Sequence, residues 1–440
     1  MKTGALPEAP GRPEHEGNPA FNVGYRALGP IFVAFTRLLF RQAGRDGVQM
    51  LAFVARDGDL LFRVAQTLAA GHKDLSGLEL RYLHLSRRAM AGTSPDLQSL
   101  HGDPNAVERV VASLRSIRTT GTLMESFQTY YSVPAELISQ HATRLHTDKG
   151  DEADLRRLLS DPIAASELAN VFAPINDRVR RYLTREGILN GHAALVDIGW
   201  RGTLQTIIQS ESNAWGTPAP RCYYLGLWNE DSRNFPKDAI GLITDQRRGR
   251  SLLEGSAWHA AFLLEAVCRA THGMVAGFTE DRDGNILPIH IERGGTREAE
   301  RASERAQKSI QEGIVAYAQW YLKTHPIGSD DEGAVRREAQ RVLFDLAFFP
   351  NEDQCSIGRQ LIHSEPTSDD SALWLITDAK KGLGNWISGL RSPWKGGYLR
   401  SNGGRSAAAI YCAAEWLSAH LPLGSKAAMR RLLALMLMGR

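Results

Sequence analysis

The stretch Met50–Leu61, MLAFVARDGDLL, constrains the fold more than any other part of the chain. An apolar run, Met50–Ala55, closes on Arg56-Asp57-Gly58-Asp59 and continues into the apolar-periodic segment Leu60–Leu68. A short apolar run that ends in charge and glycine and then becomes helical is typical of a βα unit in an α/β sheet. Polar groups at the carboxyl end of such a strand usually form the site. We therefore expect an α/β fold whose site includes Asp57.

A second unit of the same kind lies far along the chain. Ala193–Trp200, AALVDIGW, is an apolar run that carries an acid, and Arg201-Gly202-Thr203 leads from it into the helical segment Leu204–Ser210. Asp197 is an acid within apolar sequence, where a carboxylate is costly without a partner. We expect Asp57 and Asp197 to be the two poles of one crevice.

The remaining pattern completes a Rossmann-like layout of parallel strands and helices. Leu80–Leu85, which ends at Ser86-Arg87-Arg88, and Cys222–Trp228 are the other predicted strands. The roughly 100 residues between the second and third strands are helical and too many for a simple crossover, so we expect an inserted cap over the carboxyl edge of the sheet. The predicted organisation is a flexible leader (1–20), a Rossmann-like core (21–100 and 188–295), a helical cap (101–187) and a mostly helical C-terminal region (296–440).

Five further elements are predicted outside these units. Ile31–Gln42 is apolar on most faces and is expected to be a buried helix. Met274–Phe278 and Ile286–Ile291 flank a turn sequence and predict a β-hairpin. Glu254–Ala270 is expected to be one helix. Further helical pattern covers Ala372–Trp386 and the last segment, Lys426–Met438, a predicted docking helix.

Composition excludes several classes of protein. The 440 residues suggest about two or three domains. The net charge of +3, from 52 basic and 49 acidic residues, is too small an excess of positive charge to indicate nucleic-acid binding. We expect no membrane span and no signal peptide. The four cysteines are far apart in the sequence and are expected to be reduced and mostly buried, so the prediction is a cytoplasmic protein.

The two carboxylates at the first strand end suggest phosphoryl-transfer chemistry. Enzymes of the haloacid dehalogenase type use an acid that attacks phosphorus and a second, one residue further on, that protonates the leaving oxygen. Asp57 and Asp59 have this spacing. A third acid completes a magnesium site, and Asp197 is the candidate.

Groups for the phosphate follow from the same strand ends. Ser86 ends the second strand, where that fold places a phosphate-binding Ser or Thr, and Arg87 or Arg88 would hold the transferring group. Arg56 and Gly58, next to the acids, are further candidates. Helix capping is the competing role for Asp59 and Ser86.

A second register leaves the activity open. The usual pattern of these enzymes is Asp-x-Asp-Gly-Thr-Leu. Aligned on Gly58, it puts Asp57 at the acid/base position and Ala55 at the position of the nucleophile. Alanine cannot attack phosphorus, so in this register the chain is an inactive relative or uses another group.

The second strand end also has features of a phosphoribosyltransferase. The segment from Val196 to Thr203 has an acid followed by a glycine-rich turn at a predicted helix N-terminus, which can bind an anion. Gly199, Trp200, Arg201, Gly202 and Thr203 are the candidate substrate-binding residues there. The segment Val196–Thr203 has one acid where phosphoribosyltransferases have two, and its loop is shorter than theirs.

No metal site is predicted from the histidines. His84 alternates with Leu83 and Leu85 and is expected on an outer face of its strand. His259 and His272 have no metal-like spacing to a partner.

Four segments carry a family resemblance: Gly24-Tyr25 with Gly29-Pro30, Phe53–Gly58, Tyr82–Arg88 and Val196–Gln205. Over roughly residues 22–350 the chain resembles the C-terminal half of predicted hydrolases of the haloacid dehalogenase superfamily, which are encoded with bacterial surface-polysaccharide genes, often beside or fused to glycosyltransferases. The sequence around Glu265 and the hairpin Gly277–Ile291 are also similar. Larger members have an N-terminal half with a full Asp-x-Asp motif, and this chain begins after that point.

Three alternatives for function follow, two from the resemblance and one from the residues. The first is a magnesium-dependent phosphatase or phosphotransferase that acts on a phosphorylated sugar or nucleotide-sugar intermediate of surface-polysaccharide synthesis. The second is an inactive binding or adaptor protein that partners a glycosyltransferase. The third, from the Val196–Thr203 segment, is a phosphoribosyltransferase-like enzyme.

Overall fold

The structure is a computed structural model that describes residues 17–71, 77–100, 103–117, 122–147, 150–228, 236, 238–249, 251–292, 295–325, 331–364, 372–380 and 383–420. Most of the predicted leader and the predicted helix Lys426–Met438 lie outside these residues.

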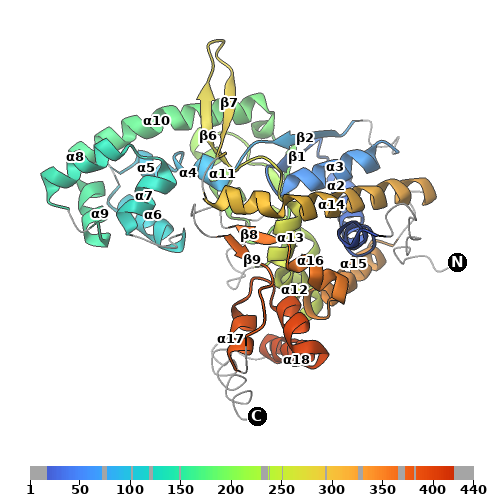
Figure 1. Ribbon diagram of the computed structural model, residues 1–440. Helices are drawn as coiled ribbons and strands as arrows, with labels where there is room; N and C mark the ends of the chain where they lie inside the picture. Colours follow the sequence, from blue (N-terminus) through green and yellow to red (C-terminus); the bar gives the residue numbers. More distant parts are fainter. Residues whose placement is uncertain are drawn as a thin grey trace.

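One parallel sheet forms the centre of the described chain (Figure 1). Its five strands are β1 (Met50–Val54), β2 (Glu79–Leu83), β3 (Ala193–Asp197), β4 (Arg221–Leu227) and β5 (Ala239–Asp245). Their order is β2-β1-β3-β4-β5, and every neighbouring pair is parallel. The predicted α/β class with a parallel sheet is therefore confirmed. The sequence pattern did not predict β5.

The order of the strands brings the predicted strand ends together. β1 pairs with β2 on one side and with β3 on the other, and Phe53 stands opposite both Tyr82 and Val196. Parallel strands in register end at the same edge of the sheet. The segments that follow β1, β2 and β3 are thus neighbours at the carboxyl edge.

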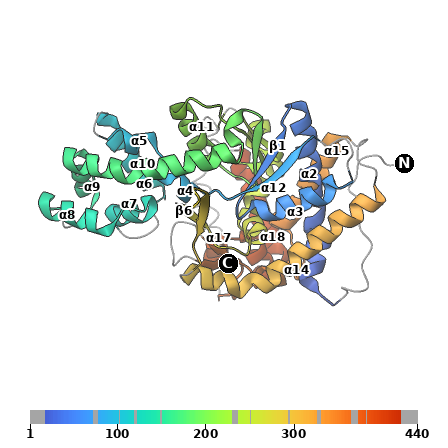
Figure 2. The ribbon, with the colours of Figure 1, turned by 90° about the horizontal axis from the view of Figure 1, so that it is seen from above.

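Alternate residues of the strands face two different apolar cores, as the pleat requires. Leu51 and Phe53 of β1 pack with α2 (Gly29–Arg45), α3 (Gly58–Ala69), α14 (Gly295–Thr324) and α15 (Glu332–Phe348). Ala52 and Val54 pack with α10 (Pro162–Arg185), α11 (Thr203–Trp215) and the hairpin of β6 (Val275–Glu280) and β7 (Ile286–His290). Figure 2 shows α14 and α11 on opposite sides of β1.

The N-terminal helical segment belongs to the core. It consists of α1 (Pro19–Asn22), the π-helical turn η2 (Val23–Leu28) and α2. By length and composition the segment Pro19–Arg45 is apolar enough to cross a membrane, but 89% of its apolar window is buried inside the protein. This is the arrangement of a core helix, and it agrees with the buried helix predicted at Ile31–Gln42.

Helices between β2 and β3 build a separate lobe on one side of the sheet (Figures 1 and 2). They follow the short helix α4 (Arg87–Ala91) and are α5 (Pro95–Gln98), α6 (Pro104–Ile117), α7 (Leu123–Tyr131), α8 (Ala135–Leu145), α9 (Glu152–Ser160) and α10. An apolar cluster of its own, which includes Phe127, Leu155 and Phe172, holds this lobe together. The residues of the predicted cap, 101–187, include the helices α6 to α10 of this lobe.

The remaining elements surround the sheet. They are η4 (Ile188–Asn190), η6 (Gln246–Arg248), α12 (Leu252–His259), α13 (Ala261–Cys268), α16 (Glu352–Gly358), β8 (Ile362–Ser364), β9 (Ala372–Trp374), α17 (Leu383–Arg391) and α18 (Lys395–His420). The predicted hairpin is confirmed, since β6 pairs antiparallel with β7.

Two predicted helices are wrong in detail. Glu254–Ala270 is not one helix, because the backbone leaves the helical conformation at Ala260, between α12 and α13. Ala372–Trp374 is a strand that pairs with β8 and not the start of a helix. The cysteines follow the prediction: all four are free, and three are buried.

A buried acid lies where α11 packs on α4 and α5. Glu211 is only 1% exposed. Burial raises its pKa to about 8, and a hydrogen bond with Thr93 limits the rise. Below that pH the protonated carboxyl can be buried without a charge.

We expect Glu211→Gln to remove a pH-dependent loss of stability. Between the ordinary pKa of 4.5 and about 8, the folded protein binds more protons at Glu211 than the unfolded chain does, so folding weakens as pH rises through this window. The variant should match the wild type at the acid end and exceed it by on the order of 5 kcal/mol above the window. Urea unfolding across the pH range measures this difference. Glu136→Gln, at an exposed position of α8, is the control, and a pH-independent difference for Glu211→Gln would contradict the assignment.

Candidate functional site

A cavity of about 970 Å³ opens at the carboxyl edge of the sheet. Its wall includes the segments after β1, β2 and β3, together with α12 and α13. Ser113 of α6 and Tyr130 of α7 come from the helical lobe, and His363 and Lys395 come from the C-terminal region. Polar residues that are distant in sequence thus share one cavity.

Four carboxylates line this cavity, and three of them lie at or beside the strand ends: Asp57 after β1, Asp197 at the end of β3 and Glu265 on α13. The fourth is Glu415 of α18. Burial raises the pKa of Asp57 to about 6, and the charge of Glu265 adds to the rise while Arg56, Arg269 and His363 oppose it. Burial, and after it the charge of Asp57, raises the pKa of Asp197 well above its ordinary value. The two aspartates therefore repel each other when both are charged, and a bound cation would relieve that repulsion.

Glu265 is held in place from two sides. The indole Nε1 of Trp200 donates a hydrogen bond to its Oε1 at 2.9 Å, and Nδ1 of His363 lies 3.1 Å from its Oε2. Sequence reasoning did not include Glu265 or His363 among the site residues. The available signal for Glu265 was an acid within the apolar helix AFLLEAVC.

A buried charge network lies beside the carboxylates. Glu300 of α14 is 2% exposed and its Oε1 accepts hydrogen bonds from Arg56 Nη2 and Ser364 Oγ, each at 2.5 Å. Arg269 Nε lies 4.0 Å from the same oxygen. Burial alone would raise the pKa of Glu300, but Arg56 and Arg269 outweigh it and lower the pKa. Burial lowers the pKa of Arg269 to about 10, so its charge persists at neutral pH.

The backbone at Arg56 is set by this surrounding structure. Arg56 has a φ of 55°, a left-handed conformation that is uncommon for a non-glycine residue. Its carbonyl accepts a hydrogen bond from the amide of Ala270 at 3.1 Å. The β1–α3 turn is thus tied to the end of α13, next to Arg269.

Of the two acids predicted after β1, only Asp57 faces the cavity. Asp59 lies in the first turn of α3 and forms an ion pair with Arg63 at 3.0 Å. Neither Gly58 nor Asp59 is among the described residues that line the cavity. A side chain at Gly58 would crowd the backbone of Phe53, with its Cβ 2.9 Å from the carbonyl carbon. The structure therefore separates the predicted catalytic pair.

Ser86 lines the cavity but its hydroxyl has structural partners. It accepts a hydrogen bond from the amide of Ala89 at 3.0 Å, which caps α4, and donates one to the carbonyl of Val275 at 2.6 Å. Arg87 and Arg88 follow it, and both line the cavity. Arg87 is exposed and Arg88 is partly buried.

The predicted loop after β3 also lines the cavity, from Gly199 to Thr203. Gly199 has a φ of 143°, and a Cβ there would lie 2.3 Å from the carbonyl oxygen of Gly226 on β4. Gly202, with a φ of 69°, precedes the first residue of α11, Thr203. The Arg201 guanidinium lies 5.8 Å from the ring centre of Trp258. These glycines allow the close approach that sets Trp200 against Glu265.

Comparison with known proteins adds no assignment: no protein-family model matches the sequence, and no curated protein matches it.

We expect Glu300→Gln to destabilise the fold by about 3 kcal/mol, because it leaves the buried guanidinium groups of Arg56 and Arg269 without their shared counter-charge. Urea unfolding at neutral pH measures the loss. Glu298→Gln, at an exposed position of the same helix, should unfold like the wild type. Equal midpoints for the two variants would contradict a structural role for the network.

Proposed function

We propose that the chain is a haloacid dehalogenase-like, magnesium-dependent phosphoryl-transfer protein that acts on a phosphorylated sugar or nucleotide sugar of surface-polysaccharide synthesis. One observation carries the proposal. The carboxylates of Asp57, Asp197 and Glu265, together with that of Glu415, share a large cavity at the carboxyl edge of a parallel sheet, and arginines share its wall.

The donor set fits a hard divalent cation. Carboxylate oxygens are the ligands that Mg²⁺ prefers, and it commonly uses one or two of them together with substrate phosphate. Asp57 and Asp197 would hold the ion, because burial and then the charge of a neighbouring carboxylate raise the pKa of each, and a cation would offset both effects. Bound there, magnesium would neutralise charge on the transferring phosphoryl group.

Basic side chains supply the complementary charge for a phosphate. Arg87, Arg88, Arg201 and Lys395 line the cavity, and the arginines can bind phosphate oxygens in a bidentate manner. Arg56 and Arg269 have Glu300 as their partner, so they support Asp57 electrostatically rather than bind substrate.

The rest of the cavity wall suits a sugar or a base. Trp228, Trp258 and Tyr130 line it and offer aromatic surface for stacking. Tyr130 belongs to the helical lobe, so the lobe would cover a bound substrate and exclude water from it.

The position of Asp59 favours one of the two registers. With Asp59 paired to Arg63 and Asp57 in the cavity, the alignment that places Asp57 at the acid/base position agrees better with the geometry. In that alignment Ala55 replaces the attacking acid, so a water molecule would be the nucleophile and Asp57 would be both a magnesium ligand and the group that handles the proton.

The same observation supports a second candidate, a binding or adaptor protein that keeps the cavity for a ligand and partners a glycosyltransferase. Trp416 and Leu417 of α18 are 52% and 39% exposed and offer apolar surface for such a partner. Phosphoribosyl transfer is the remaining alternative and rests on the Gly202–Thr203 start of α11 at the cavity wall.

Phosphate release from a panel of sugar phosphates and nucleotide sugars, with Mg²⁺ or with EDTA, tests the first candidate. We expect magnesium-dependent turnover by the wild type. Asp57→Asn and Asp197→Asn should each lower kcat/KM by roughly 100-fold or more, because each removes a group that acts in the transition state. Asp59→Asn is the matched control and should keep its activity.

The outcomes separate the three candidates. Full activity in folded Asp57→Asn and Asp197→Asn proteins would rule out the proposed site. Tight binding of a nucleotide sugar without turnover, together with capture of a purified glycosyltransferase, would favour the adaptor. Binding of phosphoribosyl pyrophosphate without hydrolysis of simple phosphate esters would favour the transferase.

A further inference from the structure

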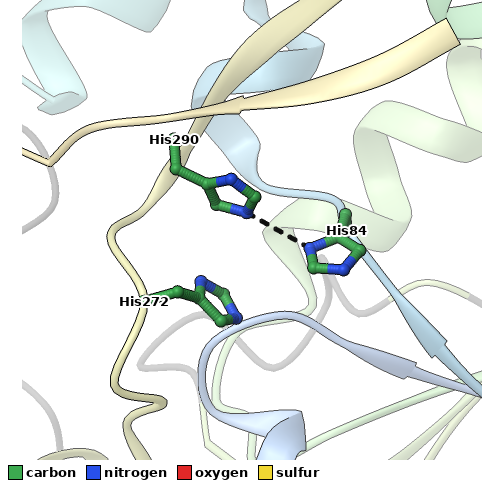
Figure 3. Close-up of side chains that lie close together, drawn as sticks. All are labelled: His84, His272 and His290. Atoms are coloured by element: carbon green, nitrogen blue, oxygen red, sulfur yellow. Dashed lines mark hydrogen bonds between the residues drawn. The ribbon is translucent and has the colours of Figure 1, made fainter.

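Three histidines from distant parts of the sequence meet beside the hairpin (Figure 3). His84 follows β2, His272 lies in the loop after α13, and His290 ends β7. One ring nitrogen of each lies within 4.8 Å of the others. None of the three is among the described residues that line the carboxylate cavity, so this cluster is a separate feature.

The spacing of two of the rings is close to that of metal ligands. Nε2 of His290 lies 3.2 Å from Nδ1 of His84. Two imidazole nitrogens on a tetrahedral zinc ion, each at 2.0–2.1 Å from it, are about 3.4 Å apart. The nitrogen of the third ring lies within 4.8 Å of the other two, so His272 has to move closer to them to reach the same ion.

The orientation of His272 is already fixed by a neighbour. Its Nδ1 lies 2.8 Å from the carbonyl oxygen of Gly273, and since a carbonyl can only accept, Nδ1 carries the proton. Nε2 is therefore left with its lone pair, which the hydroxyl of Tyr82 approaches to 2.6 Å. A ligating histidine usually donates its other N–H to a carbonyl or carboxylate in this way.

The cluster favours neutral rings, the form that binds metal. The ring centres are 4.9–5.5 Å apart, so a proton on one ring is unfavourable for the others. Burial, His272 and His290 lower the pKa of His84 to about 4, against a smaller opposing effect of Glu186. Burial and His272 also lower the pKa of His290, and Glu292 opposes this.

We propose that His84, His272 and His290 form a binding site for a divalent transition-metal ion, with Zn²⁺ as the best match. Three imidazoles suit Zn²⁺, Co²⁺, Ni²⁺ or Cu²⁺ and not Mg²⁺, which prefers oxygen. The fourth position of a tetrahedral ion is left for water.

The ion would fasten the β6–β7 hairpin to the end of β2. The hairpin already contacts this region through the hydrogen bond from Ser86 to Val275, and Arg181 of α10 holds Glu280 at 2.8 Å. Ser86 and Met274 line the carboxylate cavity and lie within two residues of His84 and His272. The ion would thus also fix one rim of the cavity.

Titration of Zn²⁺ into EDTA-treated, dialysed protein, in the presence of excess Mg²⁺, tests the proposal by calorimetry. We expect one Zn²⁺ per chain and a rise in the thermal unfolding midpoint. His84→Gln and His290→Gln should each bind Zn²⁺ roughly 100-fold more weakly or worse. Removing a hydrogen-bond partner of a metal ligand already lowers affinity by up to about 100-fold, and removing the ligand itself costs at least as much. Co²⁺ in place of Zn²⁺ should give the visible absorption of a tetrahedral site in the wild type and not in His84→Gln or His290→Gln.

Two control variants make the result specific. His192→Gln replaces an exposed histidine elsewhere and should bind Zn²⁺ like the wild type. Asp197→Asn should also keep the Zn²⁺ site, so failure of the carboxylate site and failure of the histidine site are distinguishable. Melting curves in EDTA verify that the variants fold. If His84→Gln does not fold, His290→Gln still tests the site, because His290 is partly exposed. No Zn²⁺ binding by the folded wild type, or unchanged binding in a folded histidine variant, would overturn the proposal.

Discussion

The parallel pairing of β1 with both β2 and β3 is the constraint on which the site depends. It brings the chain after Val54, after Leu83 and at Asp197 to one edge of the sheet, although these segments are far apart in sequence. The helical lobe between β2 and β3 then encloses the same edge, with Tyr130 in the cavity wall. The strand order thus determines that the acids, the cavity and the helical lobe lie at the same edge of the sheet.

Placing acids together in a buried space has an energetic cost. Burial raises the pKa values of Asp57 and Asp197, and the charges of Glu265 and Asp57 respectively add to the rise, so the charged forms of both acids are unfavourable in the folded chain. Arg56 and Arg269 reduce this cost for Asp57, and Glu300 in turn stabilises the buried arginines. An arrangement that lowers stability in this way is characteristic of sites that bind a charged ligand.

The βα periodicity predicted much of the sheet and the meeting of Asp57 with Asp197, because apolar runs that end in acids are local signals. Local patterns could not distinguish Asp57 from Asp59, since the ion pair with Arg63 depends on the turn of α3. β5 was missed because its pattern is interrupted by Gly241 and Thr244. Glu265, Glu300 and the histidine cluster depend on tertiary packing: His84 and His290 are 206 residues apart, so no sequence spacing could indicate their contact.

Calorimetric titration of Mg²⁺ into EDTA-treated, dialysed protein tests the central claim most directly. If Asp57 and Asp197 form one cation site, the wild type and Asp59→Asn will bind Mg²⁺ with the same stoichiometry, and Asp57→Asn and Asp197→Asn will not bind it. Absence of binding by the folded wild type, with or without a sugar phosphate present, would contradict the account. So would unchanged binding in either cavity variant.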